Sequence, residues 1–198
     1  MKNYDRYQNY SEKKYNKKSI SSFFMKSQAD KFLIPYTKEI KKKKILEVGL
    51  GYGYYTKYLI ENQNVVRGYD INPELGENIG IEIIEGRADQ LREKIKEKYD
   101  YVISFFMTEY LNDKEMSRFI EQGTGILSAG GIFASTFILN KGLGWLYTVL
   151  ARIKGIKKYC YSEKQIEQMI SADISRIKII HLNTVFGIPF AGLVEIQK

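Results

Sequence analysis

The stretch that decides the fold is ILEVGLGYGYYTKYLI, residues 45–60. It begins as a short apolar strand, passes through Gly49, Gly51 and Gly53, and then takes up a helical pattern. Glycines at a strand-to-helix turn let the backbone approach a ligand closely, and the free N–H groups at the helix start attract anionic groups. In an open α/β sheet such a turn lies at the carboxyl edge, where ligands bind. We therefore expect a nucleoside-containing ligand at this loop.

Strand and helix patterns alternate around this loop. Strands separated by helices imply right-handed crossovers and a mostly parallel sheet. The last two strands have only four residues between them, too few for a crossover, so they must be antiparallel neighbours. The seven expected strands are 45–48, 65–69, 81–84, 99–105, 131–139, 175–182 and 187–196. The expected helices are 22–40, 54–62, 73–78, 90–98, 113–127, 143–154 and 162–171.

Composition limits the classes of function. With 198 residues the chain is about one domain long, and one cysteine with one histidine argues against a disulfide framework and a protein-built zinc site. No apolar run is long enough to span a membrane, and the polar start lacks the apolar core of a signal peptide. A cytoplasmic protein without a metal site is expected.

The net charge of +8 is unevenly distributed. Residues 1–44 hold 13 Lys/Arg and 4 Asp/Glu, a net of +9, whereas residues 45–198 hold 18 and 19, a net of −1. Such a basic segment can bind nucleic acid or an anionic membrane. The alternative, which the Lys-, Ile-, Asn- and Tyr-rich composition favours, is a solvated lysine-rich surface.

Two acidic residues narrow the class of ligand that the glycine loop predicts. Glu47 lies two residues before the first glycine, in the pattern E-x-G-x-G-x-G, and Asp70 follows the next strand. The dinucleotide fingerprint G-x-G-x-x-G would need a glycine where Tyr54 stands. The run instead resembles motif I of the class I S-adenosylmethionine-dependent methyltransferases. Later segments resemble the later motifs of that family in order: VRGYDINPELGENI (66–79), EGRADQL (85–91), YDYVISFFMTEYLND (99–113) and LSAGGIFAST (127–136).

The resemblance implies a Rossmann-like, doubly wound sheet and an enzyme that uses S-adenosylmethionine and releases S-adenosylhomocysteine. Glu47 and Gly49 would hold the methionine amino group, Gly51 would let the loop pass under the cofactor, and Asp70 would bind the ribose diol. The remaining cofactor residues implied by the resemblance are Gly53, Ile71, Ala88, Asp89 and Phe105.

One segment departs from the family pattern. Gly86-Arg87-Ala88 stands where many relatives have Gly-Asp-Ala. The acid is then displaced to Asp89, or the adenine contact is made by the backbone near Ala88 alone. A third reading makes Asp89 the N-cap of the following helix.

Methyl transfer needs mainly an in-line arrangement of acceptor and sulfonium, so proximity and orientation can supply most of the acceleration. A general base is required only where the acceptor is protonated at the working pH. Our candidates for a catalytic role are Tyr110, which follows the fourth strand, and His181, the sole histidine. The substrate-side candidates are Tyr10, Phe106, Met107, Thr108 and Trp145.

The chain divides into a helical N-terminal lid over residues 1–40 and a core over residues 41–198. Within the core, residues 141–158 are an insert that we expect to cover the substrate. An apolar helix face with a basic end suits either a lid over an apolar pocket or a helix on an anionic membrane. The lid is favoured because the stretch is short and broken by glycines. The apolar positions are Leu146, Val149, Leu150 and Ile153.

The acceptor class follows partly by exclusion. The run from Ser104 to Met107 lacks the [D/N/S]-P-P pattern of exocyclic-amino methyltransferases, and Cys160 lies away from the position of a cytosine-C5 nucleophile. A small-molecule acceptor, aromatic, lipidic or amine, is therefore expected, with peripheral membrane contact left open. The alternatives are a tRNA or rRNA methyltransferase with a basic arm, and a non-catalytic cofactor-binding member of the fold. The acceptor atom and the oligomeric state are not determined by the sequence.

Overall fold

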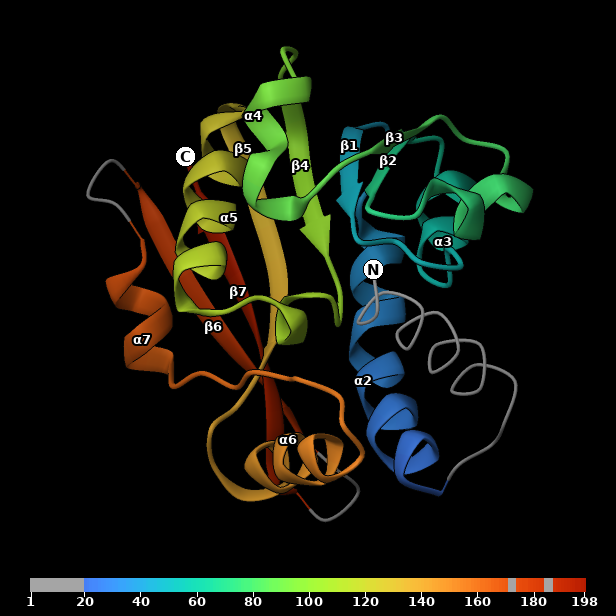
Figure 1. The fold of residues 1–198 in the computed structure, drawn as a ribbon. Helices are drawn as coiled ribbons and strands as arrows, with labels where there is room; N and C mark the ends of the chain where they lie inside the picture. Colours follow the sequence, from blue (N-terminus) through green and yellow to red (C-terminus); the bar gives the residue numbers. More distant parts are fainter. Residues whose placement is uncertain (1–19, 171–173, 184–186) are drawn as a thin grey trace.

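The computed structural model describes residues 20–170, 174–183 and 187–198 (Figure 1). The strands are β1 (Lys44–Val48), β2 (Val65–Asp70), β3 (Ile83–Glu85), β4 (Tyr99–Ser104), β5 (Leu127–Ile138), β6 (Arg176–Asn183) and β7 (Pro189–Gln197). The α-helices are α2 (Ile20–Glu39), α3 (Thr56–Glu61), α4 (Leu91–Lys94), α5 (Asp113–Gly125), α6 (Gly142–Ile153) and α7 (Glu163–Gln168). Three 3₁₀ helices are η1 (Pro73–Ile79), η2 (Ala88–Gln90) and η3 (Thr108–Tyr110). No helix in these described ranges is long and apolar enough to cross a membrane.

The strands form one sheet of seven in the order β3-β2-β1-β4-β5-β7-β6. The pairs from β3 to β5 are parallel, and β7 runs antiparallel to both β5 and β6. The predicted doubly wound α/β sheet with an antiparallel last strand is confirmed. Because the order reverses between β1 and β4, the carboxyl ends of these strands form the crevice where open α/β sheets bind ligands.

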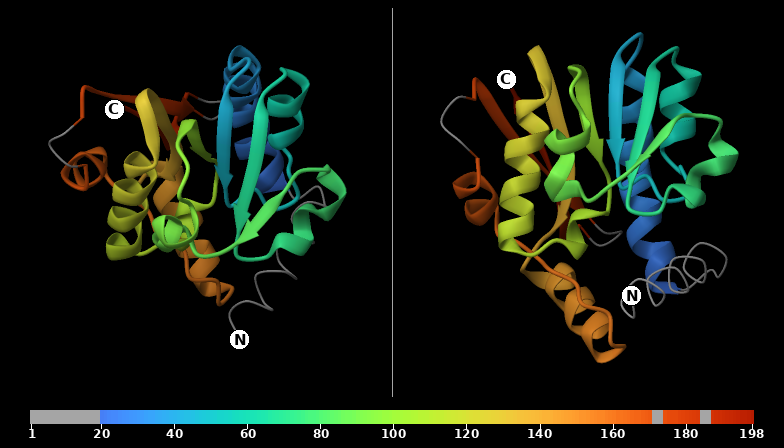
Figure 2. Two further views of the ribbon diagram at one scale, coloured as in Figure 1. Left: turned by 90° about the horizontal axis from the view of Figure 1, so that it is seen from above. Right: turned by 45° about the horizontal axis from the view of Figure 1, so that its top comes forward.

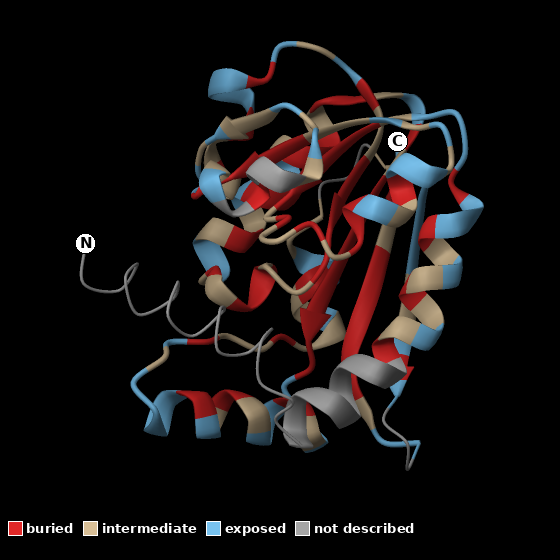
Figure 3. Ribbon diagram, turned by 90° about the vertical axis from the view of Figure 1, so that its right-hand side faces the viewer, coloured by how far each residue is buried: buried red, intermediate tan, exposed pale blue. Residues whose placement is uncertain are grey.

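Side chains that alternate along the strands pack in two separate cores. Helices cover both faces of the sheet (Figure 2), so each face has its own core. Leu46 faces a core that includes Phe119 of α5 and Ile166 of α7. Its neighbour Ile45 faces the other core, with Leu33 of α2 and Leu59 of α3. The inner strands β1, β4, β5 and β7 are accordingly largely buried (Figure 3), as expected for a sheet covered by helices on both faces, whereas the edge strand β6 is mostly exposed.

Helix α2 is part of the second core over its described side chains. Ala29 and Leu33 are buried against the sheet, and the Tyr36 hydroxyl donates a hydrogen bond of 2.8 Å to Glu195 of β7. Pro35 lies within the helix, which nevertheless continues to Glu39. Within the segment expected as a lid, the part from Ala29 to Ile40 is therefore packed on the sheet.

Some element boundaries differ from those expected. The helix expected over 90–98 is only η2 and α4, because Ile95 leaves helical geometry and is buried in the core. The capping box of α7 is present as expected: the Ser162 hydroxyl accepts from the Gln165 amide, and the Gln165 side chain accepts from the Ser162 amide.

Candidate functional site

The glycine loop after β1 has the geometry that its sequence predicts. Gly49 has φ +71°, and a Cβ added there would lie 2.3 Å from the Met107 side chain, so only glycine fits. Gly51 has φ +54°, yet a Cβ there would meet nothing within 4 Å. The loop is thus pressed against Met107 at one glycine and faces open space at the next.

A cavity of about 480 Å³ lies at the carboxyl ends of β1, β2 and β4. Five of the predicted cofactor residues line it: Gly49, Asp70, Ile71, Ala88 and Asp89. The other side comes from η3 with the residues after it, and from the chain that follows α6. Its lining residues there are Met107, Tyr110, Leu111, Asn112, Glu115, Gly155, Ile156, Lys157 and Tyr159.

Asp70 is held rigidly at the end of β2. Its Oδ2 accepts the Gly51 amide at 3.0 Å, and its Oδ1 accepts the Asn72 amide at 2.9 Å. Burial raises the pKa of Asp70, and the Asn72 and Gly51 amides oppose that rise. Each carboxylate oxygen has a second lone pair, so both can still accept a hydrogen bond from a ligand.

Glu47 is a buried acid, and burial raises its pKa by more than the Thr56 hydroxyl lowers it. Burial raises the pKa of Glu47 to about 7, and the nearby Asp70 carboxylate adds to the rise. Its Oε2 has no hydrogen-bond partner in the part of the chain that the structure describes. A buried carboxylate oxygen left in this state is costly unless a donor reaches it.

This environment predicts a pH-dependent effect of Glu47→Gln. Because the folded-state pKa lies above the unfolded value, ionisation of Glu47 costs stability as the pH rises from about 4.5 to 7. The unfolding free energy of Glu47→Gln relative to wild type should therefore grow by about 3 kcal/mol between about pH 4 and pH 8. Thermal unfolding across this pH range measures it.

Glu163 provides the control of opposite sign. Hydrogen bonds from His181 and Lys141 lower the pKa of this partly exposed group. Glu163→Gln should thus lose a little stability relative to wild type as the pH rises. A Glu47→Gln difference that does not change with pH would contradict the assignment.

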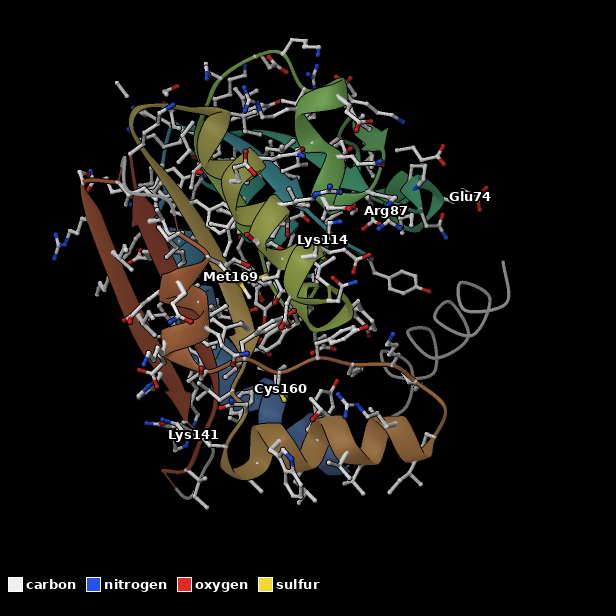
Figure 4. The ribbon with its side chains drawn as sticks, turned by 60° about the vertical axis from the view of Figure 1, so that its left-hand side comes forward. Glu74, Arg87, Lys114, Lys141, Cys160 and Met169 are labelled. Atoms are coloured by element: carbon white, nitrogen blue, oxygen red, sulfur yellow. The ribbon has the colours of Figure 1, made fainter. Side chains whose placement is uncertain are left out.

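The segment that departs from the family pattern forms an ion-pair chain beside the cavity. Arg87, labelled in Figure 4, donates to Asp89 at 3.0 Å and to Glu115 of α5 at 2.8 Å. Asp89 is nearly fully buried, and its backbone carbonyl accepts from Gln122 at 2.8 Å. The Asp89 carboxylate therefore lies at the cavity as expected but pairs with Arg87. Arg87 and Glu115 are cavity residues that sequence reasoning missed.

The residues after β4 divide between the two sides of the sheet. Phe105 packs in the α2 and α3 core, with its ring 5.1 Å from that of Tyr55, and does not line the cavity. Phe106 has φ +57°, which is strained for a residue with a side chain, and its amide donates to Thr136 at 2.7 Å. Thr108 is fully buried and donates to the Thr136 carbonyl. Of the predicted substrate residues that the structure describes, Met107 alone lines the cavity.

A fully buried ion pair lies beside Tyr110. The Lys158 ammonium contacts the Glu109 carboxylate, and the two side chains are 0% and 2% exposed. The Tyr147 hydroxyl donates to the same carboxylate at 3.0 Å. The rings of Tyr110 and Tyr147 lie 4.7 Å and 4.5 Å from the Lys158 ammonium. This Lys158 cluster ties the chain after α6 to η3.

The remaining predicted site residues lie elsewhere. Gly53 packs under Ile79 of η1, and Trp145 is exposed on α6. His181 is an exposed residue of β6 whose ring is 3.0 Å from Glu163, so it does not line the cavity. Tyr10 lies outside the described residues. No cluster of three His, Cys, Asp or Glu side chains in the described ranges could hold a metal ion.

Residues 45–131, from β1 into β5, match the model of a protein family described as methyltransferase domain. No curated protein matches the chain in sequence. Among solved structures, an O-methyltransferase family protein from Burkholderia thailandensis is similar, with a TM-score of 0.67 at 12% identity. The match covers 86% of this chain but 56% of that protein, so the chain spans little more than half its length.

Two other solved structures match over most of both chains. One is a methyltransferase from Thermotoga maritima described as a possible histamine N-methyltransferase, with a TM-score of 0.69, 15% identity, and coverage of 98% and 97%. The other is magnesium protoporphyrin IX methyltransferase from Synechocystis PCC 6803 with bound S-adenosylhomocysteine, with a TM-score of 0.68, 16% identity, and coverage of 92% and 88%. At such identities the likeness establishes the fold, and the family match establishes the domain. Residues 45–131 therefore carry a methyltransferase domain, and the chain has the fold of solved S-adenosylmethionine-dependent methyltransferases.

Proposed function

We propose that this chain transfers the methyl group of S-adenosylmethionine to a small organic acceptor in the cavity beside Tyr110. The observation that carries the proposal is the cavity itself. Asp70 and Gly49 of the glycine loop line one side of it, and Tyr110 and the segment after α6 line the other. A cofactor and an acceptor held on these two sides would face each other.

The residues on the cofactor side fit the group. The orphaned Oε2 of Glu47 would accept from an ammonium, and the open space at Gly51 leaves room for a ligand against the backbone. The two Asp70 oxygens, already fixed by amides, would each accept one ribose hydroxyl. Ile71 would pack against the base, with Asp89 at its edge. When bound, the cofactor supplies an electrophilic methyl group on its sulfonium.

On the acceptor side, the chain would mainly bind and orient. The lining is largely apolar or aromatic, which supports an acceptor with an aromatic, lipidic or amine-bearing body. The segment 155–159 would help to exclude water from the reacting atoms. Proximity and orientation would then supply most of the rate enhancement. A cytoplasmic location stays a prediction from the sequence.

Calorimetric titration with S-adenosylmethionine, S-adenosylhomocysteine and NAD tests the cofactor assignment. We expect the first two to bind and NAD not to bind. Binding of NAD, or no binding of either sulfur compound by the folded protein, would contradict the proposal. Cofactor binding without transfer to any organic acceptor would support the non-catalytic alternative. Transfer to RNA, with steeply salt-dependent RNA binding, would support the RNA alternative.

Tyr110→Phe tests the catalytic role proposed for Tyr110. Its hydroxyl is expected to orient the acceptor, so kcat/KM for the acceptor should fall about tenfold or more. The dissociation constant of S-adenosylhomocysteine should stay within about twofold, because this ligand does not reach the acceptor side. The matched control is Tyr99→Phe, which removes a hydroxyl bonded to Glu97 outside the cavity lining. If both variants had the same kcat/KM for the acceptor, the catalytic role proposed for Tyr110 would be wrong.

A further inference from the structure

Helix α6 packs on the sheet through its small residues. Gly144, Thr148 and Ala151 are buried, and they recur at the spacing of one helix face. A Cβ added at Gly144 would lie 2.3 Å from the Leu139 carbonyl oxygen and 2.5 Å from that of Phe190. This close approach of backbones fixes which side of α6 faces the protein.

Four large apolar side chains of α6 therefore point away from the protein, whereas Leu143 and Tyr147 pack against the second core. Trp145, Leu146, Leu150 and Ile153 are 53%, 41%, 49% and 76% exposed, and none of them lines the cavity. They make up four of the nine large hydrophobic residues exposed in the described ranges. Isolated exposed apolar residues are ordinary, whereas a cluster marks an interaction site. We call these four residues the α6 outer face.

The charged residues of the segment that contains α6 all have one sign. From Leu139 to Ser162 the chain has no Asp or Glu, and it has five cations. Arg152 and Lys154 are exposed beside Ile153, on either side of the apolar stripe. Lys157 follows, whereas Lys141 pairs with Glu163 at 3.1 Å and Lys158 is buried.

The position of α6 brings this face to the edge of the molecule that holds the cavity. Figure 1 shows α6 beyond the carboxyl ends of β1 and β4, and Figure 4 shows side chains of this helix that point away from the sheet. The residues directly after the helix line the cavity. A surface that touches the α6 outer face would therefore lie next to the site.

We propose that the α6 outer face docks the protein on an anionic lipid bilayer surface. Apolar and aromatic side chains flanked by Lys and Arg are the chemistry that partitions into the headgroup region, and each cation near an anionic surface adds to binding. Trp prefers this depth because its ring is apolar and its N–H is polar. A second copy fits less well, because a symmetric contact would bring like charges together with no acid between Leu139 and Ser162 to pair them.

Trp145 makes the test direct, because it is the only tryptophan of the chain and lies in the proposed contact. The full chain is mixed with vesicles of phosphatidylcholine alone, or of phosphatidylcholine with an equal part of phosphatidylglycerol. We expect a blue shift of Trp emission and co-sedimentation with the anionic vesicles, both weakened by salt. No cofactor is needed, so the outcome is independent of methyl transfer.

Two variants keep Trp145 and locate the contact. Ile153→Glu should weaken partition onto anionic vesicles by about tenfold or more, because it removes apolar area and adds a repelled charge. Val65→Glu is the matched control, since Val65 is 69% exposed. It lies at the start of β2, at the amino ends of the parallel strands and therefore away from α6. This control should bind like wild type, and both variants should keep the melting temperature because both sites are exposed.

Several results would overturn the proposal. Among them are no emission shift with anionic vesicles, equal binding to neutral vesicles, and unchanged binding of Ile153→Glu. A concentration-dependent shift without vesicles would assign the face to a second copy instead.

Discussion

Lys158→Met should lower the free energy of unfolding by about 3–5 kcal/mol, because it removes the ammonium that contacts the buried Glu109 carboxylate. The Tyr147 hydroxyl, 3.0 Å from Glu109, cannot by itself replace an ammonium. The variant also removes the cation between the rings of Tyr110 and Tyr147. Denaturant unfolding at neutral pH measures the loss.

Two control variants distinguish the cost of leaving a charge buried from the cost of losing a lysine side chain. Lys141→Met removes a 54% exposed lysine paired with Glu163, and such surface pairs contribute about 1 kcal/mol or less. Lys158→Met combined with Glu109→Gln removes both charges and keeps an acceptor for Tyr147, so much of the lost stability should return. A Lys158→Met cost no larger than that of Lys141→Met would show that the pair is not isolated from water.

Asp70→Ala should weaken the binding of S-adenosylmethionine and S-adenosylhomocysteine by at least about tenfold, about 1.4 kcal/mol. The side chain lines the cavity, and its two oxygens are oriented by the Gly51 and Asn72 amides. Its removal therefore deletes two acceptors and also loosens the loop that shapes the site. Calorimetric titration measures the affinity, with circular dichroism to confirm that the variant is folded.

Asp100→Ala is the matched control for Asp70→Ala. Asp100 also accepts a backbone amide, from Lys44 at 2.9 Å, but at the start of β4 and outside the cavity lining. It should leave cofactor affinity unchanged. An unchanged affinity in folded Asp70→Ala would contradict the ribose assignment.

The fold and the cofactor side of the site were predictable because both depend on local patterns. Alternating strands and helices determine a parallel sheet, and right-handed crossovers then place Asp70 at the same edge as the glycine loop. Five predicted residues accordingly meet at one cavity. The boundaries of the helix expected over 90–98 were not predictable, because burial of Ile95 overrides its helical pattern.

The Lys158 cluster was not predictable from the chain. Lys158 follows another lysine in a lysine-rich segment, where a solvated surface is the natural interpretation. Its partner Glu109 is 49 residues away, and only the packing of the segment after α6 against η3 brings the two together. Distant ionic partners leave no periodic pattern in a sequence.

The sequence by itself determined the sheet, the glycine loop and its acids, because periodicity and turn chemistry act within a few residues of each other. Only the tertiary structure decided which way α6 faces. The pattern reveals an amphipathic helix but not its inner side, and an apolar face is normally assumed to be buried. Here Gly144 allows the helix to touch the backbone at Leu139 and Phe190, so small residues make the close contact and four large apolar residues are left outside.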